Sequence, residues 1–137
     1  MNYIISIKHL YAERIYNGTK KYEIRTRIPT LQQYDGIYIY EPKPIALITG
    51  VIFITKILKL TPEVAWDTKA HVLGITKDNF DKYCKSKEFI YLIECDYVVK
   101  FNKPEPLSYF GFIHAPQWFV KIKLHNFFNP TYSTNYD

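Results

Sequence analysis

The sequence is short of the residues and patterns on which most metal and cofactor proteins depend. It has only two cysteines, Cys84 and Cys95, and they lack the spacing of a zinc site. Its four histidines are scattered and form neither an HxH nor an HExxH pattern. It also has no P-loop, dinucleotide-binding fingerprint or Gly-x-Ser-x-Gly motif. We therefore expect neither a metal nor a cofactor.

Long apolar runs are also missing. The longest, from Ile45 to Ile54, is interrupted by Thr49 and Gly50. It is far shorter than the roughly 20 residues that a membrane-spanning helix needs. The first residues lack the basic flank and apolar core of a secretion signal. We expect a cytoplasmic protein without a membrane partner, in which the two cysteines stay reduced and mostly buried.

What the chain does have is apolar and aromatic surface: of its 137 residues, 47% are hydrophobic and 18% are aromatic. A chain of this length and composition can bury a core that offsets its ordering entropy. We expect one domain over residues 1–125. The remaining residues, 126–137, contain aromatics without periodicity and are expected to form a loosely attached tail.

Positive charge is concentrated at the start of the chain. The net charge is +5, of which residues 1–30 contribute +4, from six basic and two acidic residues. A basic cluster of this kind is the expected electrostatic footprint of a protein that binds phosphate-bearing partners. The alternative is a solvated basic face, and charge alone does not decide between the two.

Residue patterns predict more strands than helices. Strands are expected at 3–7, 36–40, 45–57, 89–101 and 118–124, with a further strand in the alternating segment TKKYEIRTR. Short helices are expected at 10–17, after Thr61-Pro62 and after Thr76, where a hydroxyl can cap the first turn. Phe80, Tyr83 and Cys84 form an apolar stripe on the last helix. We therefore expect a mixed α/β (α+β) fold, a small and mostly antiparallel β-barrel with short helices across its openings.

The alternating segment after Gly18 has two faces of different character. Its apolar face, expected to turn towards the core, consists of Tyr22, Ile24 and Ile28. Its opposite face carries three cations and one acid: Lys21, Glu23, Arg25 and Arg27.

The opening of the chain, from Ile4 to Pro29, resembles that of ASCH-domain proteins. Their signature is a strand ending in Ser-Ile-Lys, a short helix and then Gly-x-Lys-x-x-Glu-x-Arg. The matching residues here are Ser6, Ile7, Lys8, Gly18, Lys20, Glu23 and Arg25. The segments IYIYEPKPIALITGVIFI, SKEFIYLIECDYVVKF and APQWF are similar to the family's central hairpin, late strand and closing Pro-Gln-x-Phe. His9 departs from the proline common after the lysine.

This resemblance implies a PUA-like barrel with a cleft between barrel and helices. The most similar subgroup consists of small stand-alone proteins labelled predicted transcriptional regulators. Relatives are associated with RNA binding, with recognition of modified bases and in some cases with hydrolysis. The implied partner is RNA, another nucleic acid or a modified nucleotide, but a fold does not fix a function.

The residues after the glycine turn are the main site candidates. Lys20 can direct its ammonium group at a phosphate or carbonyl, and Arg25 offers a planar fork for phosphate or base edges. Glu23 can accept hydrogen bonds from an exocyclic amine, or it can pair with either cation and only steady the fold. Lys8 is expected to face the same cleft. The predicted nucleic-acid-binding set is Lys8, Lys20, Lys21, Glu23, Arg25, Arg27, Tyr40, Gln117 and Trp118.

Aromatic residues are candidate stacking surfaces for bases. These are Tyr40, Trp66, Trp118 and Phe119, and Gln117 beside Trp118 could read a base edge. The alternative for each ring is a place in the core, because a chain so rich in aromatics must bury most of them.

An enzyme is the second reading. Some short ASCH proteins resemble amidohydrolases that deacetylate cytidine with a lysine after the glycine turn, a threonine three residues later and a glutamate before the last helix. Lys20 matches the lysine, but Glu23 occupies the threonine position and the glutamate position falls near Leu73. Metal-independent ribonuclease action stays open, because Glu23 and Lys20 could serve as base and cation. A protein-interaction module with a vestigial cleft is a third reading. The sequence favours a nucleic-acid or nucleotide binder, with a small hydrolase as the alternative.

Overall fold

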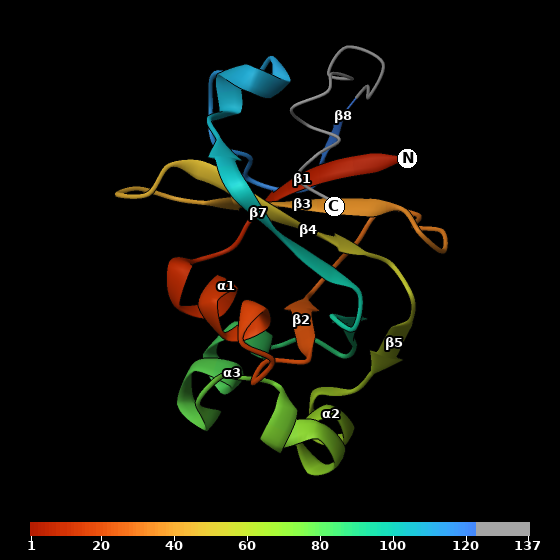
Figure 1. The fold of residues 1–137 in the computed structure, drawn as a ribbon. Helices are drawn as coiled ribbons and strands as arrows, with labels where there is room; N and C mark the ends of the chain where they lie inside the picture. Colours follow the sequence, from red (N-terminus) through yellow and green to blue (C-terminus); the bar gives the residue numbers. More distant parts are fainter. Residues whose placement is uncertain (123–137) are drawn as a thin grey trace.

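The computed structural model describes residues 1–122, and Figure 1 labels their three α-helices and all of their strands except β6. The strands in these residues are β1 (Asn2–Ser6), β2 (Tyr22–Arg25), β3 (Gly36–Glu41), β4 (Leu47–Phe53), β5 (Ile57–Leu60), β6 (Ile90–Glu94), β7 (Val98–Glu105) and β8 (Val120–Ile122). The helices are α1 (His9–Tyr16), α2 (Pro62–Lys69) and α3 (Lys77–Cys84), with 3-10 turns at Ala70–Val72 and Leu107–Phe110. The predicted tail and the last three residues of the predicted domain lie outside the described residues.

The described strands form two sheets rather than the closed barrel that the sequence predicted. The larger sheet has the order β7-β4-β3-β1-β8, and the smaller has the order β2-β6-β5. Within residues 1–122, β1 and β3 are the one parallel pair, and the other pairs are antiparallel. The mixed α/β class and the mostly antiparallel pairing are therefore confirmed, but neither sheet closes on itself.

Two segments that were predicted as single strands account for this difference. Residues 45–57 divide into β4, in the larger sheet, and β5, in the smaller one. Residues 89–101 divide in the same way into β6 and β7. The two breaks lie side by side, because the amide of Phe53 donates to the carbonyl of Tyr97 and that of Glu94 to the carbonyl of Lys56, both at 2.9 Å. Each segment is nearly continuous in apolar residues, so periodicity does not show where the chain changes sheets.

The helices begin and end where local chemistry predicts. The hydroxyls of Thr61 and Thr76 each accept a hydrogen bond from the amide three residues later, at 3.2 Å, and so cap α2 and α3. Shortly after α1, Gly18 adopts a φ of +85°, a conformation that glycine reaches without steric cost.

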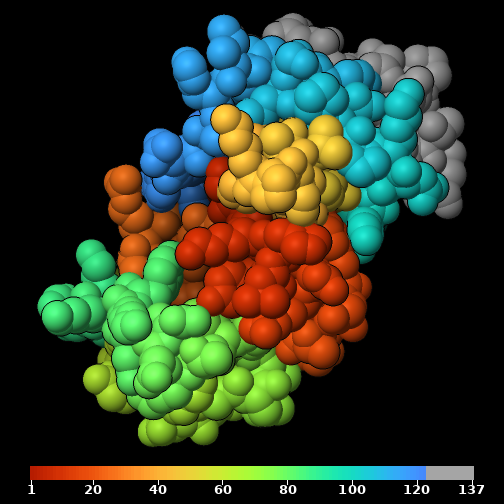
Figure 2. Space-filling view, turned by 90° about the vertical axis from the view of Figure 1, so that its left-hand side faces the viewer, coloured from red at the N-terminus to blue at the C-terminus, as the bar shows by residue number. Residues whose placement is uncertain are grey.

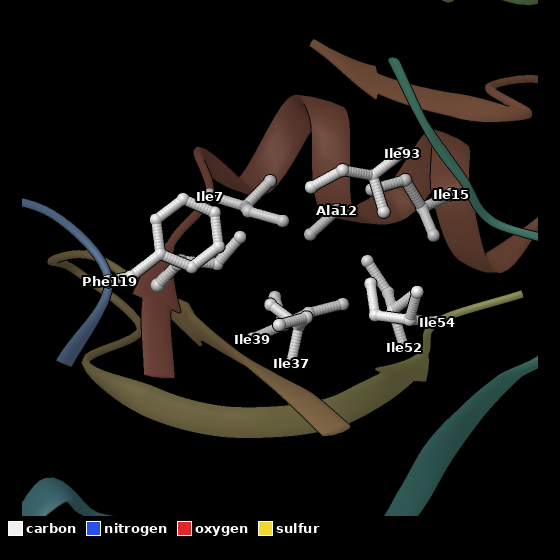
Figure 3. Close-up of a cluster of buried hydrophobic side chains, with 10 residues drawn as sticks. Ile7, Ala12, Ile15, Ile37, Ile39, Ile52, Ile54, Ile93 and Phe119 are labelled. Carbon is white, nitrogen blue, oxygen red and sulfur yellow. The ribbon is translucent and has the colours of Figure 1, made fainter. Parts of the chain in front are cut away.

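Apolar side chains cover both faces of the larger sheet. On β3, Ile37 and Ile39 face α1, whereas Tyr38 and Tyr40 face the opposite cluster with Phe110. Figure 3 shows the cluster on the α1 side, where Ala12 and Ile15 of the helix pack over isoleucines of the sheet. The residues of this cluster are Ile5, Ile7, Ala12, Ile15, Ile37, Ile39, Ile52, Ile54, Ile93 and Phe119.

A third cluster fills the space between the smaller sheet and α2 and α3. Ile24 of β2, Leu92 of β6 and Phe80 of α3 are all buried there. In Figure 1, α1, which packs on the larger sheet, lies above α3, which packs on the smaller one, and β2 lies beside them. Within residues 1–122, no helix combines the length and the apolar character that crossing a membrane would require.

The two cysteines are free thiols, Cys84 buried and Cys95 half-buried. Burial raises the pKa of Cys84 to about 11 and that of Cys95 to about 12, so both thiols are protonated at neutral pH. They have the character of apolar packing groups rather than of reactive thiolates.

Candidate functional site

A cavity of about 490 Å³ lies where the end of β1, the start of α1, the strand β2 and the helix α3 come together. Figure 2 looks onto this side of the molecule, where red α1 and green α3 are neighbours. We call this cavity the main pocket. It is lined by Ser6, Ile7, Lys8, Tyr11, Lys20, Glu23, Ile24, Arg25, Ile75, Asn79, Lys82 and Tyr83.

Lys20 reaches the main pocket from a buried position. Its side chain is only 2% exposed, and its Nζ donates a hydrogen bond to the carbonyl of Leu73 at 2.7 Å. Nζ also lies 5.3 Å from the centroid of the Tyr11 ring. Burial lowers the pKa of Lys20 from its ordinary value of 10.5, while the nearby charge of Glu23 opposes this shift.

The segment that holds Lys20 in place depends on a second glycine. Gly74 has a φ of +61°, and a Cβ atom there would come 2.5 Å from Cβ of Lys20. The carbonyl of Gly74 also accepts a hydrogen bond from Nη1 of Arg14 at 2.9 Å. The backbone carbonyls of residues 73 and 74 therefore accept hydrogen bonds from two cations, the ammonium group of Lys20 and the guanidinium group of Arg14 in α1.

Glu23 links Lys20 and Arg25, and we call these three side chains the floor of the main pocket. It is 6% exposed, and its Oε2 accepts from Nε of Arg25 at 2.9 Å and lies 2.7 Å from Nη2. Its Oε1 lies 3.9 Å from Nζ of Lys20, too far for a hydrogen bond. Both ion pairs that the sequence offered as structural alternatives are thus present. Their residues nevertheless line the pocket, so a structural role and a binding role are compatible.

Arg25 is less exposed than its place on a charged strand face suggested. Its side chain is 17% exposed, and its Nη2 donates to the carbonyl of Ser6 at 2.9 Å. Its guanidinium carbon lies 5.8 Å from the centroid of the Phe119 ring. The charged face of the alternating segment is therefore partly covered: Glu23 is buried and Arg25 half-buried, whereas Lys21 and Arg27, on either side of β2, are exposed.

Several predicted site residues lie outside the main pocket. Arg27 places its guanidinium 4.4 Å from the centroid of the Trp118 ring, and Nε1 of Trp118 donates to the carbonyl of Arg27 at 3.4 Å. Lys21 and Gln117 are exposed but do not line the cavity. Tyr40 is 5% exposed and belongs to the core cluster with Phe110, so its ring is not accessible for stacking.

The other two stacking candidates also serve in packing. Phe119 is buried with its ring centroid 6.1 Å from that of Tyr3, and Trp66 packs on Phe80 with ring centroids 5.1 Å apart. Of the four rings proposed from the sequence, Trp66 and Trp118 are half-buried, and each has an exposed cation over its ring, Lys77 at 5.5 Å and Arg27 at 4.4 Å.

The sequence-based reasoning missed the contribution of α3. Asn79, Lys82 and Tyr83 line the pocket at spacings of three and four residues, which place them on one helix face. Tyr83 was predicted to belong to the apolar stripe but is 43% exposed, and partial burial raises its pKa while Arg25 opposes the shift. In the sequence, the helical spacing of these residues is the one signal that they share a face. It does not reveal which part of the fold that face packs against.

A second cavity of about 480 Å³ lies on another side of α1, and we call it the lateral pocket. At its edge, Nδ1 of His9 lies 2.6 Å from Oε1 of the buried Glu41 and Nε2 lies 3.3 Å from Oε2 of Glu13. Deeper in, the hydroxyls of Tyr16 and Thr49 are 2.7 Å apart. Its lining residues are His9, Glu13, Tyr16, Asn17, Glu41 and Lys100. Over the described part of the chain, no group of three or more His, Cys, Asp or Glu side chains is placed to hold a metal ion.

Comparisons with known proteins agree with the resemblance found in the sequence. The model of the ASCH domain family matches residues 5–105. A crystal structure of ASCH from Zymomonas mobilis has a TM-score of 0.83 at 19% identity, covering 91% of this chain and 90% of that chain. One mutant of that protein has a TM-score of 0.81 at 18% identity, covering 91% of this chain and 92% of that chain. Another mutant has a TM-score of 0.82 at 19% identity, covering 91% of this chain and 90% of that chain. No curated protein matches the chain.

At identities below 20% the structural likeness shows the fold alone, whereas the family match depends on the sequence itself. That match spans most of the chain, from β1 to the end of β7, and includes Lys20, Glu23 and Arg25 of the main pocket. The chain therefore belongs to the ASCH domain family, whose members are generally related to nucleic acids.

Proposed function

We propose that the main pocket binds a nucleotide unit, either within RNA or as a modified nucleotide. The observation that supports this proposal is the buried group of Lys20, Glu23 and Arg25 at the floor of a 490 Å³ cavity. A pocket of this size with a few converging polar groups is typical of small-ligand sites. Its four basic residues and one carboxylate give it a formal charge of +3, which suits a phosphate-bearing ligand.

The floor has unused hydrogen-bonding capacity of both kinds. Lys20 has three N–H donors and uses one on Leu73, and Oε1 of Glu23 lies beyond hydrogen-bond distance of Lys20. A nucleobase presents adjacent donors and acceptors on its edge, so Glu23 can accept from an amine while Lys20 donates to a carbonyl or ring nitrogen. Tyr11 beside Lys20 provides an apolar ring next to this edge.

Binding of a labelled single-stranded RNA tests this proposal. We expect affinity to fall steeply with salt, because each phosphate neutralised by Lys or Arg releases counterions. Fluorescence polarisation between low and moderate salt measures the slope. A flat slope would argue against phosphate contacts, and equal affinity for heparin would mean that the protein is only nonspecifically basic.

A small hydrolase is the second candidate, favoured by the lowered pKa of Lys20. An amine of lowered pKa beside a cavity is a possible proton acceptor. Deacetylation of cytidine would also need a hydroxyl nucleophile and an orienting carboxylate. Glu23 stands at the first of these positions. At the second, Leu73 is fully buried and meets Lys20 only through its carbonyl.

We therefore predict no release of acetate from N4-acetylcytidine. Liquid chromatography of a reaction with micromolar protein, with Lys20→Ala protein as the control, measures this directly. Turnover by the wild-type chain that is lost in the variant would make the hydrolase the better assignment.

A further inference from the structure

The charges of the main pocket are arranged in two layers. At the floor, Arg25 is tied to Glu23 and to the carbonyl of Ser6, and Lys20 to the carbonyl of Leu73. The positive charge of these groups is largely committed to protein acceptors. Of the formal charge of +3 in the pocket, Lys20, Arg25 and Glu23 together account for +1, and Lys8 and Lys82 account for the other +2.

Lys8 and Lys82 are exposed and come from opposite walls of the pocket. Lys8 directly precedes α1, and Lys82 lies in the second half of α3. Among the described residues, the ion pairs of the structure include neither of them. Both ammonium groups are thus available to a ligand without first breaking a protein contact.

The start of α1 adds to the positive potential on the Lys8 side. The first turn of this eight-residue helix has no acidic residue, and no side-chain hydrogen bond caps it. Unpaired backbone amides and the helix dipole give such an end a partial positive charge. The two carboxylates near this end, Glu13 and Glu41, contact His9 and line the lateral pocket. An anionic group held by Lys8 on the side of the main pocket would therefore be favoured by the helix as well.

A ligand that matches these layers has a neutral polar end and an anionic end. The floor suits hydrogen bonding with a neutral group, because a second full charge there would disturb the Glu23–Arg25 pair. The rim, where the exposed Lys8 and Lys82 lie, suits a phosphate, since lysine binds phosphate as a mobile point charge. A nucleoside carrying a phosphate has this division, with the base as the neutral end.

We propose that Lys8 and Lys82 form a phosphate clamp at the rim, so that the pocket binds a nucleoside monophosphate unit with its base inwards and its phosphate outwards. This inference rests on the proposed function and specifies the chemical class of its ligand. It adds two residues in the role of phosphate contacts, one of which, Lys82, the sequence pattern did not single out.

Isothermal titration calorimetry with paired probes tests the clamp. The probes are the four ribonucleosides and their 5′-monophosphates, titrated into wild-type protein at low salt. We expect at least one monophosphate to bind tenfold or more tightly than its nucleoside. Lys8→Ala and Lys82→Ala should each reduce this preference about threefold or more and leave nucleoside affinity unchanged.

Lys103→Ala is the matched control, because Lys103 is an exposed lysine of β7 that does not line the pocket. It removes the same charge and should keep the full preference for the monophosphate. If Lys103→Ala reduces the preference as much as Lys82→Ala does, general electrostatic attraction explains the result and the clamp is refuted.

The outcomes also separate this inference from the proposed function. If a nucleoside binds as tightly as its monophosphate, the clamp is refuted while base recognition at the floor stands. If no probe binds, the clamp is refuted, whereas the proposed function is decided separately by the salt-dependent binding of single-stranded RNA. A trinucleotide with and without a 5′-phosphate identifies the source of the phosphate. Tighter binding of the trinucleotide when it carries a 5′-phosphate supports the end of an RNA as the ligand. If the phosphate increases affinity only in the mononucleotide, a free nucleotide is supported.

Discussion

The main and lateral pockets lie on two sides of α1, have similar volumes and are each built around a buried glutamate. In the main pocket, Glu23 pairs with Arg25 and faces Lys20, both of them largely buried. In the lateral pocket, the partner of Glu41 is His9, whose side chain is 58% exposed. The first carboxylate neutralises charge inside the fold, whereas the second fastens the start of a helix to the end of β3.

The rest of each lining extends this difference. The main pocket has four basic side chains and one carboxylate, whereas the lateral pocket has one lysine, two carboxylates and a histidine. Tyr16 and Thr49 also satisfy one another there through their hydroxyls. With histidine counted as neutral, the lining of the lateral pocket has a formal charge of −1, so this cavity has little to offer a phosphate-bearing ligand. Volume alone would have ranked the two pockets equally, and the number and burial of their cations distinguish them.

The largest expected effect concerns the two glutamates. Glu23→Gln leaves two largely buried cations facing a neutral amide, and breaking such a pair typically costs about 3 kcal/mol of unfolding free energy. Glu41→Gln keeps an acceptor for His9 and should cost about 1 kcal/mol. Urea denaturation at pH 7 gives both values. Equal losses of unfolding free energy would mean that the two carboxylates contribute equally to stability.

A second substitution identifies the cause of the larger loss. If unpaired charge is responsible, Lys20→Met should recover part of the lost stability in the Glu23→Gln protein and cost stability in the wild-type protein. A double-mutant cycle measures this coupling. Additive losses would show that charge pairing between Lys20 and Glu23 contributes nothing.

Local chemistry made much of the fold predictable. The capping residues Thr61 and Thr76 and the glycine after α1 act on neighbouring backbone groups, so their effect can be read from sequence alone. The change of sheet between β4 and β5, and again between β6 and β7, could not be predicted in this way. It depends on hydrogen bonds between residues about forty positions apart, such as those from Phe53 to Tyr97.

The candidate site follows the same division. The sequence pointed to Lys8, Lys20, Glu23 and Arg25, and the structure brings these four together in one pocket. The residues of α3 could not be identified, because an exposed Asn79 and Lys82 look like any solvated helix face until tertiary packing brings them to β2. His9 shows the reverse case: it departs from the family's usual proline, and it makes the hydrogen bond to Glu41 that distinguishes the lateral pocket.

The smaller effect concerns ligand affinity and compares Arg25 with His9. Arg25→Ala should weaken binding of single-stranded RNA by about 1–3 kcal/mol if its guanidinium contacts the ligand. Arg25→Lys should recover only part of this loss, because an ammonium group keeps the charge but not the two-pronged geometry. His9→Ala removes a side chain that lines the lateral pocket and not the main pocket, and it should leave the affinity within about twofold of wild type, a difference of about 0.4 kcal/mol.

Melting curves must accompany these titrations, because Arg25 also supports the fold. A side chain that pairs with a buried glutamate and bonds the carbonyl of Ser6 should cost more than the 1 kcal/mol or so expected of an exposed residue. We therefore expect Arg25→Ala to lower both the melting temperature and the affinity, with binding measured well below the transition. A lower melting temperature with unchanged affinity would make Arg25 purely structural. An equal loss of affinity in His9→Ala would show that ligand binding does not distinguish the two sides of α1.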